Sequence, residues 1–108
     1  MTAPIDLDHL DRYVFGDAAL LAEILGIFKE QASGLSERMS PAMAEDDWRL
    51  AAHTLKGAAR GVGAWALGEA AERAEKAAPN ERAAALAVIV DLAARAADYA
   101  DRLIDRAA

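Results

Sequence analysis

The residues that could do chemistry in this sequence gather around His53. The stretch from Trp48 to Gly63 repeats apolar residues every three or four positions, which is the spacing of one face of an α-helix. His53 falls on the opposite, polar face of that helix, so we expect its imidazole to point at solvent. An exposed imidazole is mostly neutral at neutral pH and has a free lone pair, which is the form that acts as a nucleophile.

Three cations and a glycine share the polar helix face with His53. Arg49 lies one turn before it, and Lys56 and Arg60 lie one and two turns after it. Each can bring a charge-assisted hydrogen bond to an anion held on the imidazole. Gly57 leaves open the space where a partner or phosphoryl group would collide with a side chain, although it costs about 1 kcal/mol relative to alanine inside a helix. Each residue alone fits a solvated surface, but their coincidence favours a functional site.

The first half of the chain predicts two helices. Asp6 can cap a short first helix, and Gly16 suits the left-handed residue that ends it. Asp17 can cap a second helix that Pro41 ends or kinks, with a short continuation through Met43. Apolar residues with a period of 3.6 predict the buried side of the second helix: Leu21, Ile24, Leu25, Phe28, Ala32, Leu35 and Met39. Leu20 and Ile27 are expected to widen this buried side.

The second half predicts three more helices. Asp46 or Asp47 caps the helix that carries His53, and Gly61 to Gly63 end it. A further helix spans about residues 64–78, Pro79 stops it, and Asn80 caps the last helix. The residues expected to face the core are Trp48, Ala51, Ala52, Leu55, Ala59 and Val62, then Trp65 or Leu67, Ala71, Ala74 and Ala78, and finally Leu86, Ile89, Ala93, Ala96, Ala100, Leu103 and Ala107. Ion pairs within one helix are expected at Glu69–Arg73, Glu72–Lys76, Asp91–Arg95 and Asp98–Arg102.

The composition supports an all-α fold. Hydrophobic residues make up 55% of the 108 residues, with alanine the commonest of them, and aromatic residues only 6%, which favours closely packed helices over a sheet. We therefore predict a single domain over residues 1–108, an antiparallel four-helix bundle with a short N-terminal capping helix.

Several classes of function are disfavoured. The net charge of −6 argues against nucleic-acid binding, and the absence of cysteine excludes disulfides and thiolate metal sites. No glycine-rich phosphate loop indicates an ATP or dinucleotide site, and His9 and His53 lack carboxylates at ligand spacing, so we expect no metal site. His9 is expected to be solvated, without a role. No apolar run is long enough to span a membrane, which makes a cytoplasmic protein the expectation. Nothing in the sequence calls for an oligomer, so a monomer is expected.

The stretch H-T-L-K-G-A-A-R-G-V-G resembles the signature of histidine-containing phosphotransfer (HPt) domains of bacterial two-component phosphorelays. That signature is a histidine, any residue, leucine, lysine, glycine, five residues and a glycine, matched here by His53, Leu55, Lys56, Gly57 and Gly63. The flanking segments resemble family helices, so the similarity covers most of the chain. Small polar residues common after the Lys-Gly pair are replaced here by alanines and by Arg60.

The resemblance implies a phosphoryl carrier without an ATP site, and not an enzyme in the usual sense. His53 would accept a phosphoryl group from the aspartyl phosphate of a receiver domain and pass it to the aspartate of another response regulator. Lys56 and Arg60 would stabilise phosphoryl charge, and Arg49 and Gly57 would form the docking surface. The expected partners are receiver domains and a hybrid histidine kinase, and the receiver would supply Mg²⁺, so no cofactor of its own is expected.

Two other functions use the same helix face. A helical adaptor would bind a receiver or kinase domain without carrying phosphate. A dimerisation module of a kinase commonly shows H-E-[LIF]-[RK]-T-P, which fits poorly because His53 is followed by Thr54, Leu55, Lys56 and Gly57.

Overall fold

The computed structural model describes residues 3–107, except for the side chain of Ala107, and its secondary structure is entirely helical. The predicted all-α class is therefore confirmed. The helices are α1 (Leu7–Val14), α2 (Ala18–Arg38), α3 (Glu45–Val62), α4 (Trp65–Glu75) and α5 (Arg82–Ala107), with a short 3₁₀ helix, η1 (Pro79–Glu81), before α5.

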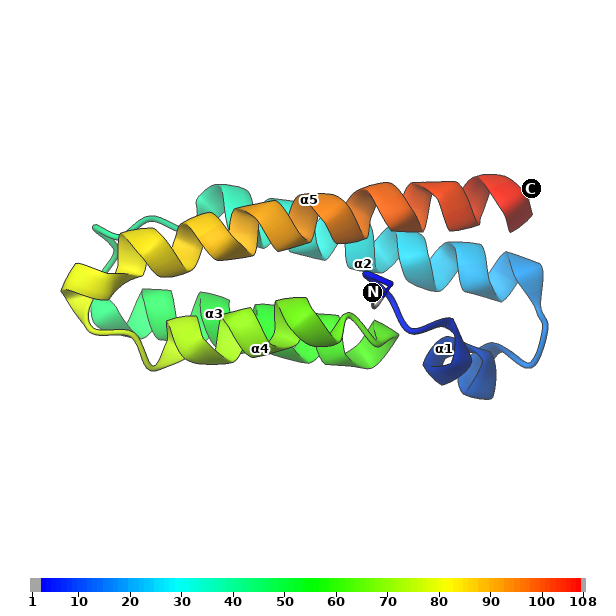
Figure 1. The fold of residues 1–108 in the computed structure, drawn as a ribbon, viewed down its shortest axis with the longest axis horizontal. Helices are drawn as coiled ribbons and strands as arrows, with labels where there is room; N and C mark the ends of the chain where they lie inside the picture. The colour runs from blue at the N-terminus through cyan, green and yellow to red at the C-terminus, as the bar shows by residue number, and fades with distance from the viewer. Residues whose placement is uncertain (1–2, 108) are drawn as a thin grey trace.

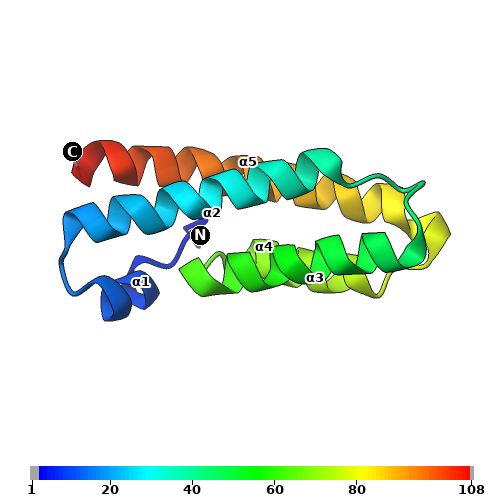
Figure 2. The same ribbon diagram turned by 180° about the vertical axis from the view of Figure 1, so that it is seen from behind.

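The four longer helices lie alongside one another in an elongated molecule of 44 × 25 × 19 Å. Figures 1 and 2 show α2 beside α5 and α3 beside α4, with α1 at the end of the molecule where α3 ends and α2 begins. α2 also packs on α3, and α4 packs on α5. The helix that carries His53 is thus held between two neighbours, α2 and α4.

The core contains a few large side chains surrounded by alanines. Trp48 and Leu55 on α3, Phe28 on α2, Leu67 on α4 and Ile89 on α5 are almost completely buried. Burial of side chains of this size stabilises the fold by about 1.5–3 kcal/mol each. The buried alanines let neighbouring helices approach closely, as the composition predicted: Ala32, Ala52, Ala59, Ala70, Ala71, Ala74, Ala93, Ala96 and Ala100.

The predicted caps of the first two helices are confirmed. Asp6 accepts a hydrogen bond from the backbone N–H of His9 at 3.2 Å, and Asp17 accepts one from Leu20 at 3.0 Å. The left-handed backbone expected at Gly16 already begins at Phe15, with φ values of 79° and 49°. The helix α2 ends at Arg38, before Pro41, and the continuation through Met43 was wrong because residues 41–43 form a turn and a bend.

Other boundaries differ from the prediction. Neither Asp46 nor Asp47 caps α3, because the helix begins at Glu45 and both residues lie inside its first turn. Their negative charges interact favourably there with the positive end of the helix dipole. Only Gly63 ends α3, and Gly61 lies inside it. The helix α4 stops at Glu75, so Ala78 is exposed beyond it, and Asn80 lies within η1 rather than capping α5.

Some predicted side-chain positions were also wrong. Leu20 and Ile27 are 37% and 54% exposed, and so do not widen the buried side of α2. Trp65 is 41% exposed, which leaves Leu67 as the buried choice on α4. Of the four expected ion pairs within helices, the described residues form only Asp91–Arg95, at 3.1 Å. The expected inward position of Ala107 lies outside the described side chains.

The connection between α3 and α4 is held by the N-terminal arm, residues 3–6, which precedes α1. Gly63 adopts a φ of 79° and its carbonyl accepts a hydrogen bond from the backbone of Asp6 at 3.0 Å. The side chain of Asp6 accepts one from the Trp65 indole at 3.0 Å. These hydrogen bonds, from Trp65 first and then from the backbone of His9, hold the pKa of Asp6 below its usual range. The arm thereby fixes the end of the helix that carries His53.

We predict that Gly63→Ala destabilises the protein by about 1–3 kcal/mol. A Cβ atom there would lie 2.9 Å from the Asp6 Cβ and would require a residue with a side chain to adopt positive φ. The matched control is Gly61→Ala, because a Cβ atom at this helical position meets nothing within 4 Å. The control should gain about 0.5–1 kcal/mol. Urea denaturation followed by circular dichroism measures both changes, and equal effects of the two substitutions would contradict this account.

Candidate functional site

His53 projects from the middle of α3 into solvent. Its side chain is 67% exposed, whereas Ala52 and Leu55 on either side of it in sequence are completely buried. The predicted exposure of His53 is therefore confirmed. The buried residues anchor α3 against the core and leave the imidazole accessible to another molecule.

A single carboxylate holds both His53 and Lys56. One oxygen of Glu75 on α4 lies 3.0 Å from Nδ1 of His53, and its other oxygen lies 2.8 Å from Nζ of Lys56. Because a carboxylate only accepts hydrogen bonds, Nδ1 carries the ring hydrogen of a neutral imidazole. The lone pair then lies on Nε2, the ring nitrogen on the far side from Glu75.

Glu75 is suited to this role because it remains ionised. The hydrogen bond from Lys56 and then the one from His53 lower the pKa of Glu75, against the opposing effect of its partial burial. The side chains of Glu75 and Lys56 are only 18% and 17% exposed. Glu75 and Lys56 therefore form a partly shielded ion pair, and the imidazole rests on its outer edge.

Trp48 fixes the end of α4 from which Glu75 projects. The indole of Trp48 is completely buried and donates a 2.7 Å hydrogen bond to the carbonyl of Ala74, the residue before Glu75. The buried guanidinium of Arg82 lies 5.3 Å from the Trp48 ring and donates to the carbonyl of Met43 at 3.0 Å. These contacts tie α3, α4, α5 and the loop before α3 together behind the imidazole.

The remaining predicted cations do not contact His53. Arg60 forms an ion pair with Glu72 of α4 at 3.2 Å, and its side chain covers Gly68. Arg49 is exposed one turn before His53. The structure thus brings Lys56 to the imidazole through Glu75, and it places Arg60 in a second cross-link between α3 and α4.

Gly57 lies at an open groove between α2 and α3. A Cβ atom at Gly57 would meet nothing within 4 Å, so the surface beside His53 has room for an approaching molecule. The exposed Ile27 forms part of the other wall of the groove. The groove is lined by Ile24, Ile27, Phe28, Gln31, Gly57, Ala58, Gly61 and Val62.

A family model supplies the decisive comparison, because the model of the Hpt domain matches residues 23–106. The chain belongs to the Hpt domain family. Hpt domains act in histidine phosphotransfer within two-component phosphorelays, where they interact with receiver domains and kinases as carriers of phosphoryl groups. The match leaves out the N-terminal arm, α1 and the first turn of α2. No curated protein and no solved structure matches this chain.

His9 supports the structure of this Hpt domain, contrary to the expectation of a solvated side chain. It is partly buried, and its Nε2 lies 3.2 Å from the carbonyl of Gly61. Its ring packs edge-on against Trp65, with ring centroids 4.9 Å apart, and against Tyr13 at 5.2 Å. His9 therefore joins α1 to the ends of α3 and α4.

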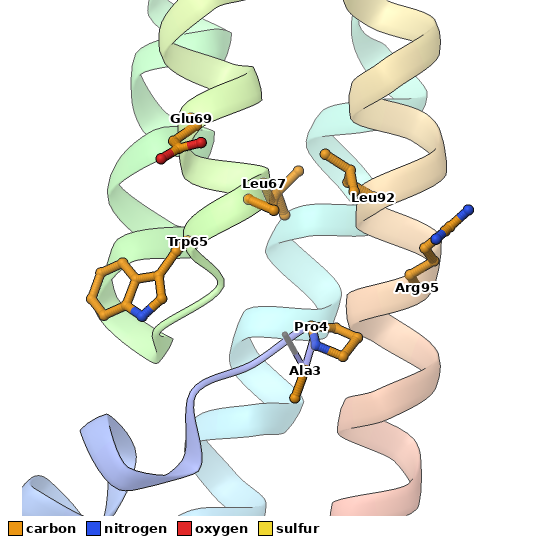
Figure 3. A pocket seen from close by; sticks show the side chains of 8 residues that line it. Ala3, Pro4, Trp65, Leu67, Glu69, Leu92 and Arg95 are labelled. Atoms are coloured by element: carbon orange, nitrogen blue, oxygen red, sulfur yellow. The ribbon is translucent and has the colours of Figure 1, made fainter. Parts of the chain in front are cut away.

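A separate pocket lies between the N-terminal arm, α4 and α5 of the Hpt domain (Figure 3). Leu67 of α4 and Leu92 of α5 point toward each other between the two helices, and the lining also includes Trp65 and Glu69 of α4, Arg95 of α5, and Ala3 and Pro4 of the arm. His53 does not line this pocket. Within residues 3–107 we find no cluster of three potential metal ligands and no helix long and apolar enough to cross a membrane.

Glu75 is the site residue that the sequence did not reveal. The spacing rules pair residues within one helix, and the partner of His53 lies on the next helix, 22 residues later. Which glutamate of α4 meets α3 depends on how α4 is rotated, and that rotation is set by packing. A single sequence carries no local signal for it.

We predict that Glu75 stabilises the Hpt domain most above pH 4.5, its ordinary pKa. Since folding lowers this pKa, the stabilising effect is complete above that value and disappears as the pH falls through the lower value of the folded protein. The difference in melting temperature between the wild type and Glu75→Gln should therefore shrink as the pH falls from 5 to 3. Thermal unfolding at several pH values tests this, and a constant difference would show that Glu75 acts only by packing.

Proposed function

We propose that this protein is a phosphorelay intermediate that accepts a phosphoryl group on His53 from the aspartyl phosphate of a receiver domain and passes it to the aspartate of another receiver. The observation that carries the proposal is the exposed imidazole whose Nδ1 is held by Glu75. Membership of the Hpt family supports the same reaction class.

The transfer is a displacement at phosphorus. The lone pair of Nε2 attacks the phosphorus atom of the aspartyl phosphate, the N–P bond forms, and the bond from phosphorus to the aspartate oxygen breaks with its electron pair. The second transfer reverses these events on another receiver. Such reactions depend mainly on alignment and on electrostatic stabilisation, so a rigid, exposed imidazole is the main contribution of this protein.

The charged neighbours of His53 would support the phosphoryl group. Lys56 donates one of its three N–H bonds to Glu75, which leaves others for a phosphoryl oxygen. Arg60 would have to exchange Glu72 for phosphate, a change made easier because both side chains are substantially exposed. Arg49 would contact the approaching receiver on the side of His53 nearer the start of α3.

The groove between α2 and α3 is the proposed docking surface for the receiver. Gly57 and Gly61 line it without side chains, and Ile27 presents apolar surface that the fold leaves uncovered. A receiver seated there would cover Ile27 and bring its aspartate to the edge of α3 where His53 projects. The receiver would also supply Mg²⁺ and thus much of the charge stabilisation.

The proposed scaffold is a single domain over residues 1–108, built as an antiparallel four-helix bundle with α1 capping one end. Figure 1 supports it, because α2, α3, α4 and α5 reverse direction from each helix to the next. Such a domain would act as a cytoplasmic monomer and a carrier without an ATP site, loaded through a hybrid histidine kinase. It would use no cofactor of its own and would not bind nucleic acid.

We predict that His53→Gln abolishes labelling by a phosphorylated receiver. Removing the nucleophile should leave no acid-labile, alkali-stable phosphate on the protein, while the fold persists because the side chain is exposed. The measurement is transfer of radioactive phosphate from a panel of phosphorylated receivers, with His9→Gln as the matched histidine control. Labelled His53→Gln protein would contradict the site. Receiver binding without any transfer to the wild type would identify an adaptor instead.

We predict that Gly57→Leu blocks transfer from a receiver and leaves the imidazole reactive. A Cβ atom at Gly57 meets nothing within 4 Å, so we expect the protein to remain folded, and the leucine side chain would project from the docking surface. Labelling by a phosphorylated receiver should fall at least tenfold, whereas labelling by phosphoramidate, a small phosphoryl donor, should be unchanged. Equal loss with both donors would mean that Gly57 serves the imidazole itself rather than docking.

A further inference from the structure

The hydrogen bond between Glu75 and His53 has a consequence for the phosphorylated protein. Phosphorylation of Nε2 leaves Nδ1 as the other ring nitrogen, and Nδ1 lies 3.0 Å from a carboxylate oxygen of Glu75. That ring is a cation when Nδ1 carries a proton and is neutral when Nδ1 has lost it. Glu75 thus faces the atom that decides the charge of the phosphorylated ring.

The proton on Nδ1 controls how readily phosphate leaves. When the N–P bond breaks, its electron pair returns to Nε2. With a proton on Nδ1, the product is neutral imidazole, a good leaving group. Without that proton, the product is an imidazolate anion, which is a much poorer leaving group. The receiver's aspartate forms the new P–O bond in either case, so the proton on Nδ1 changes the rate and not the products.

We propose that Glu75 keeps Nδ1 of phosphorylated His53 protonated and thereby sustains phosphoryl donation at neutral and mildly alkaline pH. Glu75 is then a positioning residue that acts through the ring of His53. This inference rests on the proposed function, because it presupposes that His53 carries the phosphoryl group. It concerns the donating half of the relay, in which the imidazole is the leaving group.

The charge of Glu75 matters as well as its ability to accept a hydrogen bond. An opposite charge within about 4–6 Å raises the pKa at which the ring loses its proton by about one to three units. The neutral amide oxygen of a glutamine at this position offers only the hydrogen bond. The low pKa of Glu75 keeps it ionised throughout the neutral range. Lys56 occupies the other carboxylate oxygen, so the oxygen that faces Nδ1 remains available to His53.

The other charged groups near His53 come from both helices that form the site. On α3 the cations Arg49, Lys56 and Arg60 oppose a proton on the ring, and Asp46, two turns before His53 in the first turn of the helix, favours it. On α4 the charged groups are Glu75, Glu72, which is paired with Arg60, and Lys76 beyond the end of the helix. The lining of the groove from α2 adds only neutral residues: Ile24, Ile27, Phe28 and Gln31. Of these carboxylates, Glu75 contacts Nδ1 directly, at 3.0 Å, and so it offsets the surrounding cations most strongly.

The first experiment measures the proton directly. The protein with ¹⁵N-labelled histidine is phosphorylated with phosphoramidate, and the Nδ1 resonance of phosphorylated His53 is followed by NMR from pH 5 to 10. Nδ1 of phosphorylated His53 should lose its proton at a pH about one to two units higher in the wild type than in Glu75→Gln. His9, which contacts Gly61 rather than Glu75, provides an internal reference. Coincident titrations in the two proteins would overturn the proposal.

The second experiment measures donation to a receiver that accepts phosphate from the wild type. Above the pH at which Nδ1 loses its proton, the rate should fall tenfold per pH unit, and this fall should begin at lower pH in Glu75→Gln. Glu69→Gln is the matched control, because it removes one carboxylate from the same helix on the side of the pocket in Figure 3. It should follow the wild-type profile, and a shift as large as that of Glu75→Gln would overturn a specific role for Glu75.

Failure of the inference can be told from failure of the proposed function. If phosphoramidate does not label His53, or no receiver takes the phosphate, the relay function itself is wrong. If labelling and donation occur with identical pH profiles in the wild type and Glu75→Gln, the relay stands and the role of Glu75 falls. Restoration of the wild-type profile by Glu75→Asp with an intact Nδ1 contact would further support a role for the charge.

Discussion

One carboxylate joins the two halves of the site, since Glu75 on α4 binds both Nδ1 of His53 and Nζ of Lys56 on α3. The geometry of the imidazole therefore depends on how two neighbouring helices are held. Trp48 supplies that constraint by donating to the carbonyl of Ala74, next to Glu75, from a completely buried position. The polar chemistry on the surface is thus positioned by a polar contact within the core.

The sequence could predict features that depend on local periodicity and not those that depend on helix rotation. The buried residues of α3 follow a 3.6 period, so the exposure of His53 and the openness of Gly57 were predictable. Glu72 was expected to pair with Lys76 on its own helix, but it reaches Arg60 on α3. Cross-helix pairs of this kind follow from tertiary packing, which no spacing within one helix encodes.

Apolar character alone also could not separate core from interaction surface. Ile27 fits the apolar pattern of α2 yet remains 54% exposed, at the groove beside Gly57. The sequence pattern indicates only that a residue is apolar. It does not indicate whether the same chain or another molecule covers that residue. Caps were predicted well where an aspartate directly precedes a helix, as at Asp6 and Asp17. They failed at Asn80, where a 3₁₀ turn intervenes.

The two tryptophans that contact opposite ends of α4 lie in different surroundings, which affects their fluorescence. Trp65 begins the helix, bonds to Asp6 of the N-terminal arm and is 41% exposed, whereas Trp48 is buried and bonds to the last turn beside Glu75. These are the only two tryptophans of the chain. Because indole emission depends on the polarity around the ring, the two emit at different wavelengths and differ in access to quenchers. Intrinsic fluorescence therefore reports separately on the end of α4 that supports the imidazole and on the end held by the arm.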